Sequence, residues 1–230
     1  MAKQVSRRSR TVKSKAKSKA SPKSKATKPV FTGPRAVLLA RRAELTPEWV
    51  ADKSWQACER VRKVLAKFWP ELTVATFRPM AQEAQVGLLD PWFRSAHARL
   101  CFPRLIDHKG NMQLAEVKSD SHWRFNSYGI QEPSTAAEVV SPKQVDVILV
   151  PCVGVTAKGH RVGMGKGYYD RLLKNMPEAL KIVVAFDFQV VSKLPQAKWD
   201  QAVDWVITER REIRTPRVGA WLKRRRLSLG

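Results

Sequence analysis

Two short runs of almost entirely apolar residues constrain the fold most strongly. VDVILVP spans residues 145–151, and KIVVAFD spans residues 181–187. A strand with one face in water alternates apolar and polar residues, whereas a strand covered by helices on both faces is apolar throughout. Further β-rich runs at 73–78, 98–102 and 203–208 are separated by helical or irregular stretches. The sequence therefore predicts an α/β fold, with a mostly parallel sheet flanked by helices in a three-layer, Rossmann-like arrangement.

Helical signals surround these runs. A short helix is expected over residues 35–45, and the tripeptide TPE at 46–48 then supplies a capping hydroxyl, a proline at the first helical position and an acid in the first turn. Apolar residues recur at helical spacing from Val50 to Phe68, which predicts a stripe that faces the core. Another helix is expected from about Tyr168 to Met176.

Positive charge is concentrated at the two ends of the chain. The formal net charge is +23; residues 1–43 hold 14 lysines and arginines with no acidic residue, and residues 209–230 hold eight basic and two acidic residues. The Lys/Ser/Ala-rich composition of residues 1–32 offers little to bury and predicts a disordered basic arm. We expect residues 33–209 to form one α/β domain and residues 210–230 a basic C-terminal tail.

Cysteine usage and hydropathy indicate the compartment. Cys58, Cys101 and Cys152 lie far apart and include no CxxC pair, which predicts reduced thiols rather than a disulfide framework or a structural zinc site. No segment approaches the roughly 18 consecutive apolar residues that cross a bilayer. We expect a cytoplasmic protein without membrane contact. Organelle targeting through residues 1–32 is the alternative, because the arm lacks acids and is rich in serine, although it has more lysine than arginine.

The run RVGMGKGYYDRLL, residues 161–173, follows the first apolar run. Its three glycines occupy alternate positions between 163 and 167, so that backbone N–H groups and a helix N-terminus face the space beyond the sheet. Arg161 and Lys166 add positive charge, which suits an anionic ligand. A glycine follows Lys166, so the run is no Walker A loop, and its spacing and position do not fit a Rossmann fingerprint. A purely structural turn is the alternative.

The same region resembles a known family. VDVILVPCVGVTAKGHRVGMGKGYYDRLL is similar to the signature block of the 5-formyltetrahydrofolate cyclo-ligase family, also called 5,10-methenyltetrahydrofolate synthetase. AFDFQVVSKLPQAKWDQAVDWVITE resembles the family's carboxy-terminal block, and weaker similarity through FRPMAQE and ARRAELTPE extends the likeness over about residues 35–209. The resemblance implies an ATP-dependent ligase that converts 5-formyltetrahydrofolate to 5,10-methenyltetrahydrofolate and releases ADP and phosphate. In that reaction ATP phosphorylates the formyl oxygen, and N10 then attacks the activated carbon.

The resemblance also implies roles for individual residues. It assigns catalytic roles to Lys166 and Arg161, and Mg²⁺ binding to Asp170 and Asp200. The residues that it assigns to ATP binding are Arg35, Arg161, Val162, Gly163, Met164, Gly165, Lys166, Gly167, Tyr168 and Tyr169. The residues that it assigns to folate binding are Glu83, Met164, Gly165, Lys166, Gly167 and Tyr168.

Plain structural interpretations of these side chains stay open. Lys166 would then be a solvated loop charge, Asp170 an acid favoured by the dipole at a helix N-terminus, and Asp200 a surface acid. Tyr168 either stacks on the pterin or packs against its own helix.

The chain also departs from the family's pattern at four positions. Phe31 and Pro34 replace the lysine and leucine of the K-x-x-L-R element that ends at Arg35, which removes an expected phosphate contact. Cys152 stands in place of a glycine, and Phe77 in place of the usual tyrosine near the folate contact. These changes put efficient ATP binding in question more than membership of the family.

The basic arm supports a second function class. Its run KSKAKSKASPKSKATK resembles lysine-rich tails that bind duplex nucleic acid without reading its sequence and with a steep salt dependence. The alternative is thus a nucleic-acid-associated protein whose cyclo-ligase-like domain has degenerated. Residues 44–208 are nearly neutral and contain no reader helix or RNP-type motif, which favours the enzyme. A monomer that takes 5-formyltetrahydrofolate as its small-molecule partner is expected.

Overall fold

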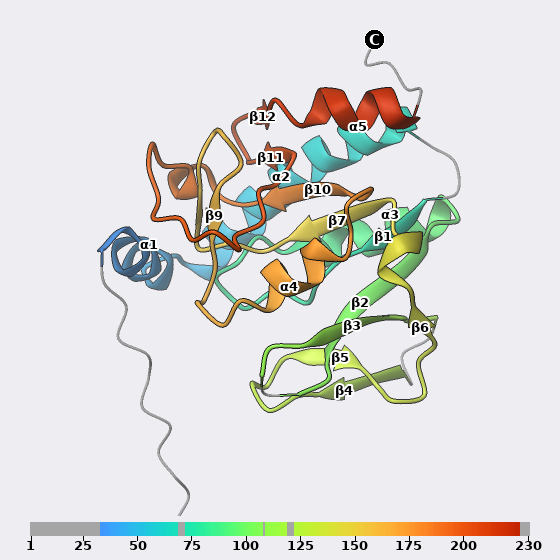
Figure 1. Cartoon of the computed structure of the whole chain (residues 1–230). Helices are drawn as coiled ribbons and strands as arrows, with labels where there is room; N and C mark the ends of the chain where they lie inside the picture. Colours follow the sequence, from blue (N-terminus) through green and yellow to red (C-terminus); the bar gives the residue numbers. More distant parts are fainter. Residues whose placement is uncertain (1–32, 69–71, 108, 119–121, 226–230) are drawn as a thin grey trace, which may run out of the picture. The chain divides into compact units, whose positions relative to one another are not determined.

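A computed structural model describes residues 33–68, 72–107, 109–118 and 122–225 of the chain. Within these ranges, the main sheet has the strand order β12-β11-β10-β7-β1-β2-β3-β6 (Figure 1). Its five central strands run parallel: β1 (Thr73–Ala75), β2 (Arg99–Leu105), β7 (Val147–Val150), β10 (Leu180–Val184) and β11 (Trp205–Ile207). Antiparallel pairings continue the sheet at its margins through β3 (Met112–Glu116), β6 (Val139–Val140) and β12 (Glu212–Arg214). The predicted α/β fold is confirmed.

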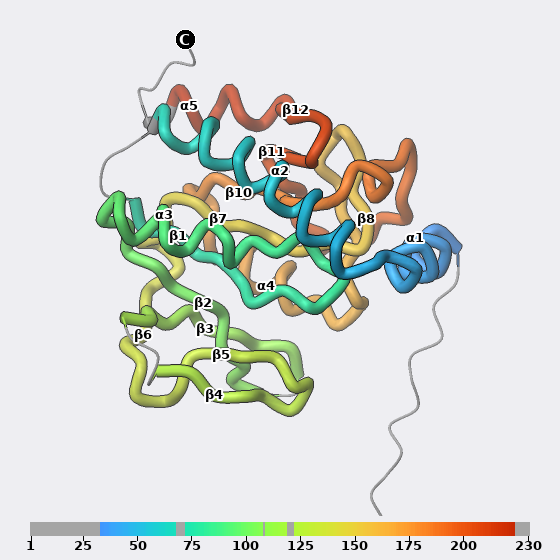
Figure 2. The backbone as a smooth tube through the Cα atoms, turned by 180° about the vertical axis from the view of Figure 1, so that it is seen from behind, coloured from blue at the N-terminus to red at the C-terminus, as the bar shows by residue number. Residues whose placement is uncertain are grey.

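Helices cover both faces of this sheet, as the apolar runs predict. In β7, Val147 and Leu149 belong to one apolar cluster, whereas Ile148 and Val150 belong to another on the opposite face. The first cluster includes residues of α2 (Pro47–Leu65), α3 (Asp90–Ser95) and α5 (Val218–Arg225), and the second includes residues of α4 (Tyr168–Lys174). Figures 1 and 2 show α4 on one side of the sheet, and α2 and α5 on the other.

The expected helix start at residues 46–48 is present. The hydroxyl of Thr46 accepts a hydrogen bond from the backbone N–H of Trp49 at 3.3 Å, and α2 begins at Pro47. Buried residues recur along α2 from Val50 to Leu65, where the α-helix ends three residues before the predicted stripe does. The expected helix over 35–45 is α1 (Gly33–Ala43), and its second residue is Pro34, which helices accept in their first turn.

The chain beyond residue 209 differs from the expected basic tail. Strand β12 pairs with β11, and α5 packs onto the sheet through Trp221, whose side chain is 1% exposed and whose Nε1 donates to the carbonyl of Glu178 at 3.0 Å. The segment packs against the domain because Val218 and Trp221 are buried in the core, and a large aromatic side chain such as Trp221 gains much from burial. The high net charge of the segment gave no indication of these two residues. The predicted arm, residues 1–32, lies outside the described residues.

Two small hairpins and several single turns complete the described structure. The hairpins are β4 (Trp123–Phe125) with β5 (Gln131–Pro133), and β8 (Gly154–Val155) with β9 (Arg161–Val162). The 3₁₀ turns are η1 (Ala66–Phe68), η2 (Val86–Leu89), η4 (Pro142–Gln144) and η5 (Asp187–Gln189). No helix among the described residues has the length and apolar content required to cross a membrane.

Burial also characterises the three cysteines. Each of them, Cys58, Cys101 and Cys152, is free and buried, and burial raises the pKa of each thiol to about 12. All three are therefore neutral thiols near neutral pH, and they pack as small apolar side chains.

Candidate active site

The glycine loop connects β9 to α4 and depends on left-handed backbone. Gly165 has φ +86° and Gly167, the residue before α4, has φ +68°. Side chains with a Cβ rarely adopt such angles, so glycine at these two positions allows the tight reversal. Met164, Gly165 and Lys166 are exposed. The loop thus presents its backbone and the Lys166 ammonium group to solvent or to a ligand.

A buried arginine fixes one end of this loop. Arg161 on β9 is 6% exposed, and its Nη2 donates to Oδ1 of Asp170 on α4 at 2.9 Å. The same Oδ1 accepts the backbone N–H of Gln201 at 3.1 Å. The Arg161 guanidinium carbon also lies 5.9 Å from the ring centroid of Tyr169. Through these two contacts Asp170 ties β9, α4 and the segment at Gln201 together.

A second arginine approaches the loop from α1. A Cβ placed on Gly165 would lie 3.6 Å from Nη1 of Arg35. Helix α1 is held there by Leu38, which packs in one apolar cluster with Val153, Val162 and Leu194. The structure thus brings three predicted ATP contacts, Arg35, Arg161 and Lys166, to one loop. Val162 is 5% exposed, and its side chain packs in this cluster. Only the backbone of Val162 is therefore left to contact a ligand.

The two predicted magnesium ligands lie in neighbouring segments. Asp200 closes a turn in which its Oδ2 accepts the backbone N–H of Ala197 at 2.8 Å. The next residue, Gln201, is the one that donates to Asp170. Within the ranges that the structure describes, no group of three or more His, Cys, Asp or Glu side chains has the arrangement of a metal site. The two carboxylates would therefore need oxygen ligands from outside the protein to complete the coordination of a cation.

Glu83, the predicted folate contact, is a largely buried carboxylate at the same edge of the sheet. Its side chain is 12% exposed; Oε1 lies 3.4 Å from Nη1 of Arg42, and Oε2 accepts the backbone N–H of Met80 at 3.0 Å. Burial raises the pKa of Glu83 above its ordinary value, and the charge of Arg42 opposes that rise. Glu83 shares a small space with Phe77 and with Cys152, which lies two residues beyond the end of β7. The substitution of glycine by Cys152 is thus accommodated within the core.

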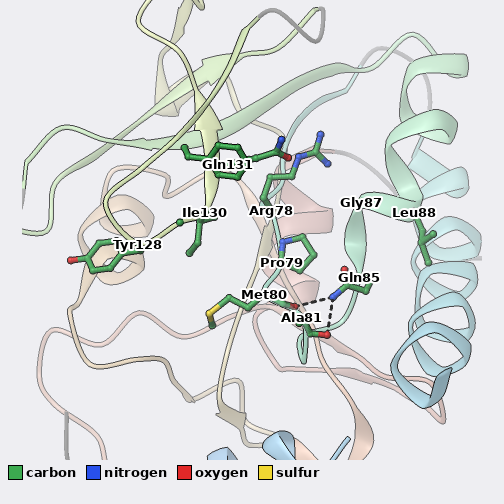
Figure 3. Close-up of a pocket in the computed structure, with 12 residues that line it drawn as sticks. Arg78, Pro79, Met80, Ala81, Gln85, Gly87, Leu88, Tyr128, Ile130 and Gln131 are labelled. Atoms are coloured by element: carbon green, nitrogen blue, oxygen red, sulfur yellow. Dashed lines mark hydrogen bonds between the residues drawn. The ribbon is translucent and has the colours of Figure 1, made fainter. Parts of the chain in front are cut away.

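A larger cavity of about 660 Å³ is lined in part by Met80, Ala81 and Gln85, the near sequence neighbours of Glu83 (Figure 3). One wall is the segment between β1 and η2, and the other is the turn between β4 and β5. The residues that line the cavity are Arg78, Pro79, Met80, Ala81, Gln85, Gly87, Leu88, Phe125, Tyr128, Gly129, Ile130 and Gln131. Apart from FRPMAQE, which ends at Glu83 and supplies residues 78–81 of the lining, no motif in the sequence indicated this lining.

A pair of tyrosines connects this cavity to the glycine loop. The hydroxyl of Tyr128, in the cavity wall, lies 3.4 Å from the hydroxyl of Tyr168, the first residue of α4. Their hydrogen bond is the main reason that the pKa of Tyr168 is raised to about 12. This contact brings the cavity wall next to the first residue of α4, which follows the glycine loop beyond the carboxyl edge of the parallel strands, where α/β sheets bind their ligands.

Three functional candidates in this site were not predicted. Arg42 pairs with Glu83, and Tyr128 contacts Tyr168. Arg78 pairs with Asp90 at 2.7 Å and lies over the ring of Trp123 at 4.2 Å. Arginines are frequent in this chain and carry no spacing signal, so only the fold distinguishes these two from the rest. Tyr128 lies in the turn of the β4–β5 hairpin, which the sequence analysis did not predict.

Comparisons with known proteins identify the family of the chain. The profile of the 5-formyltetrahydrofolate cyclo-ligase family matches residues 27–209. The chain belongs to the 5-formyltetrahydrofolate cyclo-ligase family. A relative in this family, 5-formyltetrahydrofolate cyclo-ligase of Escherichia coli K12, is 31% identical over 172 residues, which cover 73% of this chain and 94% of the relative.

Solved structures from the family extend the agreement to the fold. The structure of Aquifex aeolicus 5,10-methenyltetrahydrofolate synthetase matches with a TM-score of 0.71 and 34% identity, over 79% of this chain and 91% of that one. A synthetase from Mycoplasma pneumoniae, at 22% identity, matches with a TM-score of 0.63 over 76% of this chain and 96% of that one, and this likeness concerns the fold alone. The family profile ends at residue 209, so β12 and α5 lie beyond the matched region.

Proposed function

We propose that this cyclo-ligase family member converts 5-formyltetrahydrofolate to 5,10-methenyltetrahydrofolate with hydrolysis of ATP to ADP and phosphate. The observation that carries this proposal is the contact of Tyr128 with Tyr168, which joins a cavity of about 660 Å³ to a glycine loop that contains Lys166 and lies beside Arg35 and Arg161. The reaction requires two ligands side by side, one bulky and planar and the other a polyanion. The cavity suits the bulky planar ligand, and the glycine loop suits the polyanion.

The glycine loop suits the triphosphate of ATP. Glycines let phosphate oxygens approach backbone N–H groups closely, and Lys166 and Arg35 add charges that oppose those of the phosphates. The Nε of Arg161 is buried and has no hydrogen-bond partner among the described residues. A buried donor without an acceptor is costly, so an acceptor on a ligand at this position would be stabilised.

Asp170 and Asp200 suit Mg²⁺ bound together with ATP. Mg²⁺ usually takes one or two carboxylates from a protein and completes its octahedron with phosphate oxygens and waters. When bound, the ion would neutralise charge on the transferring phosphoryl group. Two carboxylates on adjoining segments fit that mode of binding better than a closed site made of protein ligands alone, which the described residues do not contain.

The cavity suits the folate. Its volume lies within the range of about 300–1,000 Å³ that is common for small-molecule sites. Glu83, which follows the lining residues Met80 and Ala81 in the chain, is a carboxylate whose raised pKa reflects burial, and pterin N–H groups would supply hydrogen-bond donors to it. Tyr128 and Tyr168 supply aromatic surface where the two ligands would meet.

The chemistry needs mainly positioning and charge compensation. The formyl oxygen on N5 attacks the terminal phosphorus of ATP, and the bond from that phosphorus to ADP breaks. N10 then attacks the formyl carbon and gives up its proton, and the phosphate departs with the former formyl oxygen, which closes the ring. Lys166 and Arg161 would stabilise negative charge on the transferred group in both steps.

The assay follows the methenyl product by its absorbance with 5-formyltetrahydrofolate, ATP and Mg²⁺. We expect turnover by the wild type, and at least a hundredfold lower rates for Lys166→Ala and Asp170→Asn, in the manner of lost transition-state contacts. A melting curve for each variant checks that it is folded. Equal rates for all three proteins would remove the two site assignments, and no product from the wild type would overturn the function.

Two further properties of the chain belong to this proposal. We infer action in a reducing compartment, the cytoplasm, from three separate free cysteines. From the lysine-rich composition of residues 1–32 we infer salt-sensitive contact with polyanions in addition to catalysis. We expect the protein to be retained on DNA, less strongly as salt is added, and not at all when residues 1–32 are deleted. Retention unchanged by the deletion would show that residues 1–32 do not bind the DNA.

A further inference from the structure

One arginine on α4 contacts the glycine loop and a distant hairpin at once. The Nη2 of Arg171 donates to the carbonyl of Lys166 at 2.6 Å, and its Nε donates to the carbonyl of Gly110 at 2.8 Å. Gly110 belongs to the turn between β2 (Arg99–Leu105) and β3 (Met112–Glu116), more than fifty residues earlier in the chain. A guanidinium that bridges two carbonyls in this way restricts both loops.

The hairpin turn is shaped to receive this side chain. Gly110 has φ +102°, and a Cβ at this position would overlap the Arg171 guanidinium. Asp107 stiffens the same turn, because its carboxylate accepts the backbone N–H of Lys109 at 2.9 Å and that of Asn111 at 3.1 Å. The carbonyl that Arg171 binds is thus part of a turn with its own internal hydrogen bonds rather than a loose end.

Fixing the Lys166 carbonyl also fixes the next N–H group. A peptide unit is planar and trans, so the carbonyl of Lys166 and the N–H of Gly167 point in opposite directions. When Arg171 holds that oxygen, the Gly167 N–H is directed away from Arg171, and the oxygen cannot turn to face an anion. Because Gly165 and Gly167 have no Cβ, the backbone of this short segment could otherwise adopt many orientations.

We propose that Arg171 is a positioning residue for the nucleotide, which braces the glycine loop against the β2–β3 turn. It acts through the loop and not on the reacting atoms, so it is not a catalytic residue. The inference rests on the proposed function insofar as the bound anion is the triphosphate of ATP. The mechanical part, an ordered loop held by one guanidinium, stands on the two hydrogen bonds alone.

The test compares Arg171→Met, Arg171→Lys and Gly110→Ala with the wild type and with Lys174→Met, an exposed cation one turn further along α4. We expect the KM for ATP to rise about tenfold in Arg171→Met, as for the loss of a charged hydrogen bond, with little change in the KM for 5-formyltetrahydrofolate. Arg171→Lys should recover part of this loss, and Lys174→Met should match the wild type.

Limited trypsin digestion supplies a measurement that does not depend on activity. Cleavage between Lys166 and Gly167, followed by mass spectrometry, should be several times faster in Arg171→Met and in Gly110→Ala than in Lys174→Met. Gly110→Ala approaches the brace from its other side, so it keeps the test decisive if Arg171→Met does not fold.

The possible outcomes separate the two proposals. Unchanged cleavage in both Arg171→Met and Gly110→Ala would overturn the brace, whether or not the KM for ATP changes. Faster cleavage with an unchanged KM for ATP would overturn its role toward the nucleotide. A wild type that forms no methenyl product would overturn the proposed function, whereas the digestion would still decide whether Arg171 orders the loop.

Discussion

The two halves of the site are built in different ways. The phosphate half is nearly continuous in sequence, since Arg161, Lys166 and Asp170 lie within ten residues. The half beside the cavity is assembled from α1, the segment before η2, and the β4–β5 turn. The first half relies on backbone and on positive charge, whereas the second relies on a buried carboxylate and aromatic side chains. A contiguous loop can be recognised in a sequence, whereas an assembled wall needs the fold.

Each half also contains one buried ion pair, and the two pairs differ. Arg161 and Asp170 have side chains 3% and 18% exposed and a separation of 2.9 Å. Arg42 and Glu83 are similarly buried, at 5% and 12%, but lie 3.4 Å apart, and burial still raises the pKa of Glu83. The tighter pair should therefore support the fold more strongly, and the looser one should be more sensitive to its surroundings.

The largest effect is expected from breaking the tighter pair. Arg161→Met leaves Asp170 buried without its cation, which should lower the free energy of unfolding by about 3 kcal/mol, measured by urea denaturation. Methenyl product formation should also fall at least a hundredfold. The double variant Arg161→Met/Asp170→Asn should recover most of the stability but none of the activity. Recovery of both would mean that Arg161 serves the fold alone.

A smaller and more selective effect is expected in the other half. Glu83→Gln keeps the shape of the side chain but removes a charged acceptor, so kcat/KM for 5-formyltetrahydrofolate should fall roughly 10- to 100-fold. The KM for ATP should stay within a factor of about two. Glu138→Gln, at a carboxylate 60% exposed on the surface, provides the matched control. A rise in the KM for ATP of similar size to the folate effect would contradict the division of the site into two halves.

The looser pair also predicts a pH dependence. Glu83 faces Arg42 from α1, Cys152 from the end of β7 and Tyr169 from α4; burial raises the pKa of both Cys152 and Tyr169, so Arg42 is the charged group among the three. If ionised Glu83 accepts hydrogen bonds from the folate as proposed, kcat/KM should fall as the pH drops through its raised pKa. In Arg42→Met that pKa rises further, and the acid limb should move to higher pH.

The free energy of unfolding should depend on the same pKa, but it should increase as the pH drops, whereas kcat/KM should decrease. A carboxyl whose pKa is raised by folding binds its proton more tightly in the folded state. Its contribution to stability therefore increases as the pH falls from the raised pKa towards the ordinary value of about 4.5. In Arg42→Met, the pH range over which the free energy of unfolding increases should be wider, as measured by urea denaturation at a series of pH values. An acid limb at the same pH in Arg42→Met, Arg42→Lys and wild type would show that Arg42 does not influence Glu83.

How much of this molecule its sequence predicts depends on the range of the interactions. The apolar runs indicated β7 and β10, and the TPE tripeptide indicated the start of α2, because strand burial and helix capping are local signals. The glycine loop and its cationic residues could also be recognised in the sequence, because they lie within one short run. Arg42 and Tyr128 were not, because their roles depend on contacts across 41 and 40 residues of chain. Trp221 was missed for another reason: net charge dominated the interpretation of a segment in which one aromatic residue is buried.

The smallest effect should come from the hydroxyl pair between the two halves. Tyr128→Phe and Tyr168→Phe each remove one partner of a hydrogen bond that is 3.4 Å long and exposed, so each should reduce kcat/KM for 5-formyltetrahydrofolate only about two- to fivefold. The aromatic rings stay in place, so Tyr128→Ala should cost clearly more than Tyr128→Phe. If the hydroxyls act only on each other, the double Phe variant should equal either single variant. Additive losses would instead mean that each hydroxyl contacts a ligand separately, and the two halves would then be joined by the substrates rather than by the protein.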